Sequence, residues 1–343
     1  MRNVLFEIDP DIRKARTIDA SFYIDPGHFE ASRDKIFARC WHFLGHRNEI
    51  DVLKPAVILP GFLDEPVLLV NRSGKISSLS NVCTHRAKLL VEEPCRADLI
   101  RCSYHGRRFS LDGKMISMPE FDGVEDFPAE ADNLRRFQCA ERGGFVFTSI
   151  QPAVEFGESV DDASILDTVE PTVLELTQTR EYEVNAHWAL YCENYLEGFH
   201  IPYVHRGLNE IVDYGSYRTD LFRYSSVQTG YGGDGEIVAR YLFIFPNLMF
   251  NIYPWGISVN VVRPIAPDKT VVEFLTYVGN ESLLGEGAGA DLHSVELEDE
   301  AVVESVQKGV RSRFYRSGRY SPSREQGTHH FHRLIAEFMN APL

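Results

Sequence analysis

Two short segments, Cys83-Thr-His85 and Cys102-Ser-Tyr-His105, decide how the first large part of this chain folds. Together they read C-x-H-x16-C-x2-H, so each segment carries one thiol and one imidazole. These side chains are ligands that iron and zinc accept. We therefore expect a metal centre held between two loops.

The matched pairs favour a Rieske [2Fe–2S] cluster, in which two Cys bind one iron and two His bind the other. Neutral imidazoles in place of two thiolates reduce the negative charge of the cluster and raise its reduction potential. Such a cluster passes single electrons. The alternative is a structural Cys2His2 zinc site, but zinc sites usually pair their cysteines as C-x2–4-C. Here each pair is mixed.

The sequence around these loops predicts β structure from residue 43 to residue 150. Short apolar runs such as Val67–Val70 and Gly143–Phe147 are broken by turn residues, and Asp112-Gly113 is a strong turn signal. We expect the two ligand pairs to lie on loops of this β module.

Length and charge limit the class of protein. A chain of 343 residues exceeds the usual size of one hydrophobic core, so two domains are expected. The formal net charge is −15, which disfavours nucleic acid as a partner. No stretch of about 18 apolar residues predicts a membrane span, and residues 1–11 lack the apolar core of a secretory signal. Six scattered cysteines and a cluster that needs free thiolates indicate the cytoplasm.

A second metal site is predicted in Glu193-Asn-Tyr-Leu-Glu-Gly-Phe-His-Ile-Pro-Tyr-Val-His205. On a helix, Glu193, Glu197 and His200 would share one face. His205 follows five residues later, about 140° further round an unbroken helix. Pro202 disfavours helix at the residue before it and turns the chain. The two imidazoles can then converge on one ion.

A carboxylate ligand is predicted on a later helix, over residues 291–311. Helical spacing places Asp299 on an apolar stripe, where a carboxylate is costly unless it is paired or bound to a metal. The stripe consists of Val295, Val302, Val303 and Val306, and the opposite polar face of Glu296, Glu300 and Glu304. Helical phase alone leaves Glu298 and Glu300 open as alternatives. His200, His205 and Asp299 would form the 2-His-1-carboxylate triad of non-haem Fe(II) oxygenases, with positions open for O2 and substrate.

The two motifs together resemble the Rieske non-haem iron oxygenases, over nearly the whole chain. The segments Glu193–His200 and Asp299–Gln307 are most similar to the branch with choline, glycine betaine and carnitine monooxygenases. The resemblance implies an α+β protein: an N-terminal segment (1–42) packed on the catalytic domain, an all-β Rieske domain (43–150), and a helix-grip catalytic domain (151–343) in which an antiparallel sheet surrounds a long helix.

The resemblance also implies roles and partners. Glu197 would bridge His200 to the cluster ligand His105 of an adjacent subunit in a homotrimer. Asn194 would assist the iron or only hydrogen-bond within the fold. A separate flavin- or ferredoxin-type reductase would supply electrons from NAD(P)H, with O2 as co-substrate. The residue Ala87 departs from the Gly that is more usual after the first ligand pair.

Three functions remain open from the sequence. The first is hydroxylation of a small organic substrate next to a quaternary nitrogen, with release of an aldehyde. The second is oxygenation of an aromatic compound, which the same iron ligands would serve. The third, outside enzymes, is a Rieske electron-transfer protein with a ligand-binding domain and no mononuclear iron.

Some aromatic side chains of the catalytic half could form a cage for a trimethylammonium group. Most of them are expected to be ordinary core residues, and the sequence does not identify the subset. The candidates are Tyr191, Tyr195, Phe199, Tyr203, Tyr214, Tyr217, Phe250, Tyr253 and Trp255. His329, His330 and His332 resemble a metal motif but are expected to pack or face solvent on a C-terminal helix.

Overall fold

The computed structural model describes residues 6–160, 165–166, 174–285, 287–289 and 292–342. The chain divides into two compact units. We call Trp41–Pro152 the inserted unit, because it interrupts the sequence of the other, and we call the described residues of 1–40 and 153–343 the main unit. No helix among the described residues is long and apolar enough to cross a membrane.

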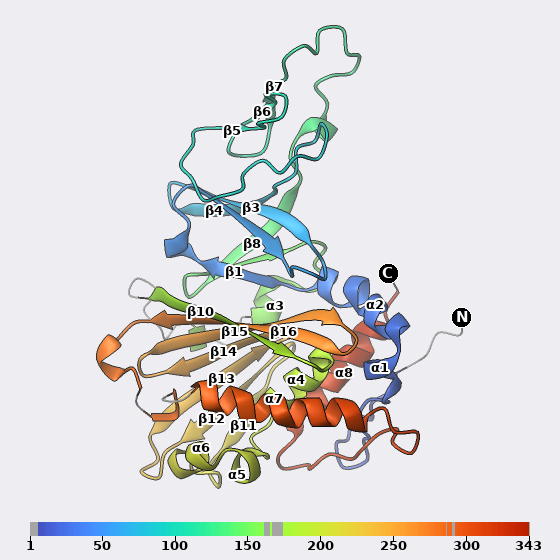
Figure 1. Ribbon diagram of the computed structural model, residues 1–343, viewed down its shortest axis with the longest axis vertical. Coiled ribbons are helices and arrows are strands. Elements are labelled where there is room, and N and C mark those ends of the chain that lie inside the picture. The colour runs from blue at the N-terminus through green and yellow to red at the C-terminus, as the bar shows by residue number, and fades with distance from the viewer. Residues whose placement is uncertain (1–5, 161–164, 167–173, 286, 290–291, 343) are drawn as a thin grey trace. The chain divides into compact units, whose positions relative to one another are not determined.

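The inserted unit is built from antiparallel β-strands (Figure 1). Its elements are β1 (His42–His46), η2 (Arg47–Glu49), β2 (Leu53–Ile58), β3 (Glu65–Arg72), β4 (Lys75–Ser80), β5 (Ile100–Arg101), β6 (Arg108–Phe109), β7 (Met115–Ser117), η3 (Glu130–Asp132), β8 (Arg136–Arg142) and β9 (Phe145–Ser149). A six-stranded sheet has the order β1-β9-β8-β4-β3-β2, and β5-β6-β7 form a small second sheet among the described residues. The all-β prediction for this region is confirmed.

The main unit combines one large sheet with helices. Its elements are α1 (Ser21–Ile24), α2 (Pro26–Lys35), η1 (Phe37–Arg39), α3 (Phe156–Val160), β10 (Glu175–Val184), α4 (Trp188–Tyr195), α5 (Ile201–Val204), α6 (Arg206–Ile211), β11 (Arg218–Leu221), β12 (Ser225–Tyr231), β13 (Ile237–Ile244), β14 (Leu248–Tyr253), β15 (Gly256–Ala266), β16 (Lys269–Val278), η5 (Glu281–Leu283), η6 (Gly287–Gly289), α7 (Leu292–Gly309) and α8 (Gln326–Asn340). The described strands form one antiparallel sheet, β10-β16-β15-β14-β13-β12-β11. The α+β class is confirmed.

Helix α4 lies in the core of the main unit, because Trp188 to Cys192 are all buried. A helix that is apolar all round needs cover on every side. The sheet, α7 and α8 provide it, and α7 crosses in front of the sheet in Figure 1. Hydrogen bonds tie α7 to the start of α4: Gln307 Oε1 accepts from the His187 backbone at 2.9 Å, and Glu304 Oε1 accepts from the Asn185 side chain at 2.7 Å.

The N-terminal helices also belong to the main unit. Lys35 Nζ donates to the carbonyl oxygens of Met339 and Ala341 at the end of α8, both at 2.7 Å. The Tyr23 hydroxyl donates to Glu193 Oε1 at 2.7 Å on α4. These contacts join the beginning of the chain to α4 and α8.

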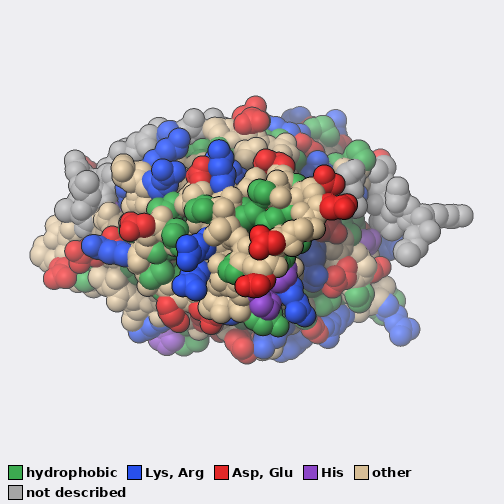
Figure 2. Space-filling view, turned by 90° about the horizontal axis from the view of Figure 1, so that it is seen from above, with side chains coloured by type: hydrophobic (Ala, Val, Ile, Leu, Met, Phe, Trp, Pro, Cys, Tyr) green, Lys and Arg blue, Asp and Glu red, His purple; other side chains and the backbone are tan. Residues whose placement is uncertain are grey.

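The surface carries charges of both signs. On the face shown in Figure 2, Lys and Arg side chains are interspersed with Asp and Glu. The net charge of −15 is therefore not gathered into a single patch on that face.

Close packing of α8 against the end of α4 gives a first prediction. A Cβ atom at Gly327 would lie 2.3 Å from the carbonyl oxygen of Leu196, so Gly327→Ala must push the two helices apart. We expect a loss of about 1–3 kcal/mol of stability, measured by chemical denaturation. Gly309→Ala on α7 is the control, since no heavy atom lies within 4 Å of the added carbon. Equal stability of the two variants would contradict the prediction.

Candidate metal centres and the pocket beside them

The two ligand-bearing loops of the inserted unit have the same backbone geometry. In each loop the Cys amide donates to the carbonyl five residues on, Lys88 at 2.9 Å and Arg107 at 2.8 Å. In each, the residue four after the Cys donates back to the Cys carbonyl at 3.0 Å and has a positive φ, +56° at Ala87 and +76° at Gly106. Two loops with the same backbone hydrogen bonds therefore each present one Cys and one His, at C-x-H spacing in the first and C-x2-H spacing in the second.

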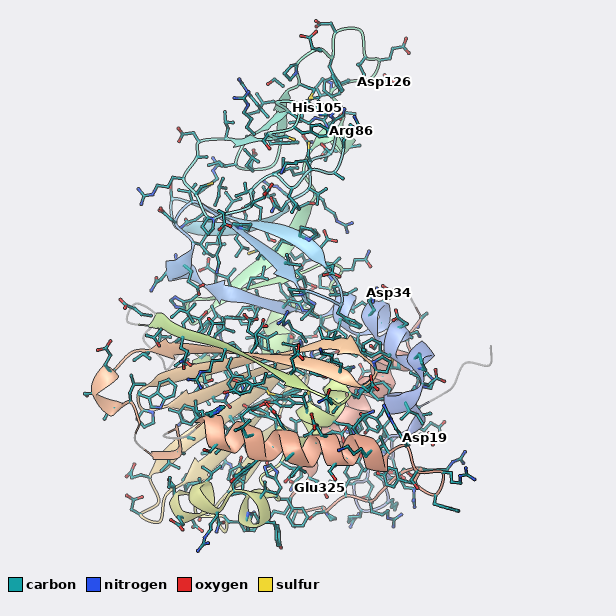
Figure 3. All side chains as sticks on the ribbon, in the orientation of Figure 1. Asp19, Asp34, Arg86, His105, Asp126 and Glu325 are labelled. Carbon is teal, nitrogen blue, oxygen red and sulfur yellow. The ribbon has the colours of Figure 1, made fainter. Side chains whose placement is uncertain are left out.

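The four predicted cluster ligands come together at these loops. Cys83 and Cys102 are buried free thiols within hydrogen-bond reach of each other. The rings of His85 and His105 lie 4.9 Å apart, centroid to centroid. Figure 3 labels His105 and Arg86 near one another, and Arg86 lies over the ring of Tyr104, which packs on His105.

Burial and nearby charges shift the pKa of Cys83 and of His85 in opposite directions. Burial raises the pKa of Cys83, and the Cys102 thiol adds to this, while backbone amides of His85 and Arg86 oppose it. Desolvation and the positive charges nearby lower the pKa of His85, which favours the neutral ring that binds metals. His105 Nδ1 is buried and has no hydrogen-bond partner among the described residues. A bound iron would satisfy that nitrogen and ionise the thiols.

Arg107 links the two loops through a hydrogen bond. Its guanidinium is 2% exposed and donates to Thr84 Oγ1 at 2.7 Å and Asp132 Oδ1 at 2.6 Å. Thr84 lies in the first loop and Arg107 directly after the second. The sequence analysis did not identify this residue, because a single Arg after a ligand gives no signal of what it contacts.

In the main unit, His200, His205 and Asp299 converge. His205 Nε2 lies 3.1 Å from His200 Nε2 and 3.0 Å from Asp299 Oδ1, and the third side of this triangle measures 3.6 Å. One ligand atom from each of these three side chains lies within 4.8 Å of the other two. Ligands about 2.0–2.2 Å from one ion lie roughly 3 Å from each other, as these atoms do.

Two outer carboxylates orient the imidazoles. His200 Nδ1 lies 2.8 Å from Glu197 Oε1, and His205 Nδ1 lies 2.7 Å from Glu298 Oε2. A neutral imidazole that donates from Nδ1 has a lone pair on Nε2. Two lone pairs and a carboxylate oxygen then face one another, an arrangement that repels unless a cation lies between them. This donor set fits a divalent metal.

The same charges act on the proton affinity of His205. Burial lowers its pKa, but hydrogen bonds to Asp299 and Glu298 outweigh this and raise it overall. The site therefore attracts positive charge. Glu298, which helical phase left open as a ligand, lies on the outer side of His205, and Asp299 lies on the inner side.

The local backbone differs from the prediction in two respects. Helix α4 ends at Tyr195, so Glu193 and Glu197 do not share a helical face, and Glu193 instead contacts Tyr23 and His332. Pro202 does not end a helix but lies in the first turn of α5, where its missing N–H costs nothing. His200 and His205 flank this short helix, which brings their Nε2 atoms to 3.1 Å from each other.

The predicted faces of α7 were also partly wrong. Glu296 is buried, whereas Val306 is exposed. The inward face carries Glu296, Val303 and Gln307, because Tyr191 and the His187 backbone provide hydrogen bonds to its polar members. Apolarity alone could not reveal these partners.

A pocket opens beside the triad, with about 740 Å³ of empty space including its open mouth. Asn194, Glu197 and the triad line it, so the predicted site residues of the main unit share one cavity. Its aromatic lining consists of Tyr191, Tyr195, Tyr217, Tyr241, Tyr253 and Phe274. Tyr241 and Phe274 were missed by the sequence analysis, which could not tell which face of their strands turns inward.

The other aromatic candidates lie elsewhere. Tyr203 is 81% exposed, Phe250 is in the core, and Tyr214 packs against the guanidinium of Arg324 at 4.0 Å. Trp255 is buried behind Tyr253, with the rings stacked 5.2 Å apart. Phe199 is partly exposed and does not line the pocket. His329 and His332 of α8 are buried.

Comparison with known proteins agrees with this arrangement. Residues 40–128 match the Rieske [2Fe-2S] domain family, and residues 213–341 match the catalytic domain of the ring hydroxylating alpha subunit. The chloroplastic choline monooxygenase of Arabidopsis thaliana is 31% identical over 96% of this chain and 85% of its own. The carnitine monooxygenase oxygenase subunit of Escherichia coli K12 is 28% identical over 95% and 94%.

Solved structures share the fold. The quaternary ammonium Rieske monooxygenase CntA in complex with L-carnitine superposes with a TM-score of 0.81 at 24% identity, covering 97% of this chain and 100% of that one. Naphthalene 1,2-dioxygenase with bound indole superposes with a TM-score of 0.75 at 18% identity, covering 95% and 92%. The Rieske match favours a [2Fe–2S] cluster over the zinc alternative.

The positive φ of Ala87 gives a prediction for the cluster loops. An L-residue in this conformation is strained by about 1–2 kcal/mol, and Gly relieves the strain at a smaller entropic cost. We expect Ala87→Gly to stabilise the inserted unit by roughly 0.5–1 kcal/mol, measured as a higher temperature for loss of the cluster's visible absorption. Ala56→Gly within β2 is the control and should destabilise. A loss of stability in both variants would refute this account of Ala87.

Proposed function

The chain belongs to the Rieske non-haem iron oxygenases, and we propose that it hydroxylates a small quaternary ammonium compound at a carbon next to nitrogen. The observation that carries the proposal is the tyrosine-rich pocket that opens on His200, His205 and Asp299. Aromatic faces attract methylated ammonium groups, which have no N–H to donate. The relatedness to choline and carnitine monooxygenases supports the same substrate class.

In this proposal the residues divide into two centres. Cys83, His85, Cys102 and His105 hold the [2Fe–2S] cluster, and His200, His205 and Asp299 hold a mononuclear Fe(II). When bound, the two centres supply single electrons and the activation of O2. The protein's own part is to bind the substrate, orient its C–H bond and exclude water.

Neighbouring side chains position the ligands. Glu197 fixes the His200 ring through Nδ1 and bridges it to a cluster histidine, His105 of an adjacent subunit. Glu298 fixes His205 in the same way on its outer side. Asn194 lines the pocket next to these groups and assists the iron or the substrate through its amide.

The proposed assembly is a homotrimer in which electrons pass between subunits. Electron transfer between subunits is described for CntA, whose fold this chain shares. A separate reductase of the flavin or ferredoxin type supplies the electrons from NAD(P)H. For each hydroxylation, one O2, two electrons and two protons give the hydroxylated carbon and one water. When the hydroxylated carbon is bonded to nitrogen, its C–N bond breaks and the hydroxyl group loses its proton, which gives an aldehyde and a tertiary amine.

Oxygenation of an aromatic compound is the second candidate, favoured by the shared fold with naphthalene 1,2-dioxygenase. A Rieske electron-transfer protein without mononuclear iron is less consistent with the converging triad, which that function does not need.

The ligand assignment predicts the iron content of variants. Asp299→Ala should lower the iron from about three to about two atoms per chain while the visible spectrum of the cluster stays unchanged. Glu298→Ala should weaken binding of the mononuclear iron by roughly 10–100-fold, since it removes only the orienting contact. Glu304→Gln, on the same helix but directed at Asn185, should keep all the iron. An unchanged iron content in Asp299→Ala would remove Asp299 from the site.

The substrate class is tested by a single turnover. The reduced protein is exposed to O2 with methylated ammonium compounds or aromatic acids, and the products are identified by mass spectrometry. We expect about one oxygenated product per mononuclear iron from a quaternary ammonium compound. An oxygenated aromatic product, without any product from an ammonium compound, would contradict the proposed substrate class and support oxygenation of an aromatic compound.

A further inference from the structure

A buried carboxyl group that neither metal centre uses lies in the wall of the pocket. Glu296 of α7 is 4% exposed and lines the pocket three residues before Asp299. The Tyr191 hydroxyl donates to its Oε2 at 2.7 Å. Its Oε1 is buried and has no hydrogen-bond partner among the described residues. Half of the carboxyl group is therefore without a partner that would offset its burial.

No strongly basic side chain accompanies Glu296 in the described lining of the pocket. Burial raises the pKa of Glu296 to about 8, Asp299 and Glu300 add to this, and the Tyr191 hydrogen bond opposes it. Among the described residues that line the pocket, none is Lys or Arg. A buried carboxylate in such a site is costly unless a cation comes near it. No Lys or Arg of the pocket supplies such a cation, and a cationic ligand could, in addition to the metal proposed at Asp299.

The aromatic walls of the pocket that contains Glu296 suit a cation without N–H groups. Tyr195, Tyr217, Tyr241 and Tyr253 line the same pocket. The rings of Tyr241 lie 6.3 Å from Tyr195 and 6.2 Å from Tyr253, each nearly perpendicular. Desolvation raises the pKa of all four phenols, so they stay neutral and keep their electron-rich faces. Such faces attract a trialkylammonium group.

Apart from the tyrosines and the two histidines, the described polar groups that line the pocket are neutral amides or acids. Asn251 and Asn260, on β14 and β15, line the pocket and are each 5% exposed. The Asn251 amide donates to the Ser258 carbonyl and to Asn260 Oδ1, both at 3.2 Å, so this part of the lining is polar but uncharged. A substrate carboxylate would face Glu197, Glu296 and Asp299 with no Lys or Arg among the described lining residues.

We propose that Glu296 and these four tyrosines form the ammonium subsite, and that the substrate is a cationic quaternary ammonium alcohol without a carboxylate group. This inference rests on the proposed function and narrows it. Glu296 acts as a specificity-determining residue through its charge. Its partner Tyr191 holds the carboxyl group in place.

The test compares ligands of matched shape on the iron-loaded protein by isothermal titration calorimetry. The probes are choline, its neutral isostere 3,3-dimethyl-1-butanol, and L-carnitine, which carries a carboxylate. We expect the wild-type protein to bind choline at least about 10-fold more tightly than either of the others. Glu296→Gln keeps the size and the Tyr191 contact, and should reduce that preference by about 10-fold or more without changing the affinity for the isostere.

Glu304→Gln is the matched control, since it removes an acid from the same helix outside the pocket, and it should keep the preference for choline. Iron content and the cluster spectrum report whether each variant is intact. The inference is overturned if wild-type protein fails to prefer choline, or if Glu296→Gln weakens choline and the isostere equally.

Binding and turnover separate this inference from the proposed function. Choline bound in a Glu296-dependent way but never oxygenated would refute the proposed function and leave the ammonium subsite standing. Turnover of a quaternary ammonium compound with the same KM in wild-type and Glu296→Gln would support the function and refute the subsite.

Discussion

The site in the main unit depends on one unfavourable contact between three side chains. His200, His205 and Asp299 present two imidazole lone pairs and a carboxylate oxygen to each other at 3.0–3.6 Å. These groups repel unless a cation lies among them, so surrounding structure must hold them in place. Glu197 and Glu298 do so by accepting from the outer nitrogens of the rings. The hydrogen bonds between α4 and α7 fix Asp299 relative to the two histidines.

In the inserted unit, backbone hydrogen bonds position the candidate cluster ligands. Two loops with the same hydrogen-bond pattern each present one thiol and one imidazole, and Arg107 joins them through Thr84. The positive φ at Ala87 shows that the first loop keeps this geometry without Gly, at a cost in strain. The position of the ligands therefore takes precedence over local conformational preference.

The two units position their polar groups by different means. In the main unit, the contact between α7 and α4 also forms the pocket. Because α7 turns a carboxyl-bearing face toward α4, it delivers Asp299 to the triad and Glu296 to the pocket wall together. The tyrosines of α4, β13 and β14, with Tyr217, complete that wall with uncharged aromatic faces. In our proposals these two carboxylates favour positive charge at two points of one pocket, a metal ion at Asp299 and a cationic ligand at Glu296.

The sequence by itself determined the candidate ligand residues, the β nature of residues 43–150 and the α+β class. Ligand spacing is a local property, and Cys83, His85, Cys102 and His105 are recognisable from it. Only the tertiary structure decided which acid of α7 faces the histidines, that Glu296 is buried, and that Tyr241 and Phe274 line the pocket. Each of these depends on a partner distant in the sequence. Burial of the Glu296 carboxyl group on an inward face needs a hydrogen-bond donor such as the Tyr191 hydroxyl. Helical periodicity does not reveal that donor, because it lies far away in the sequence.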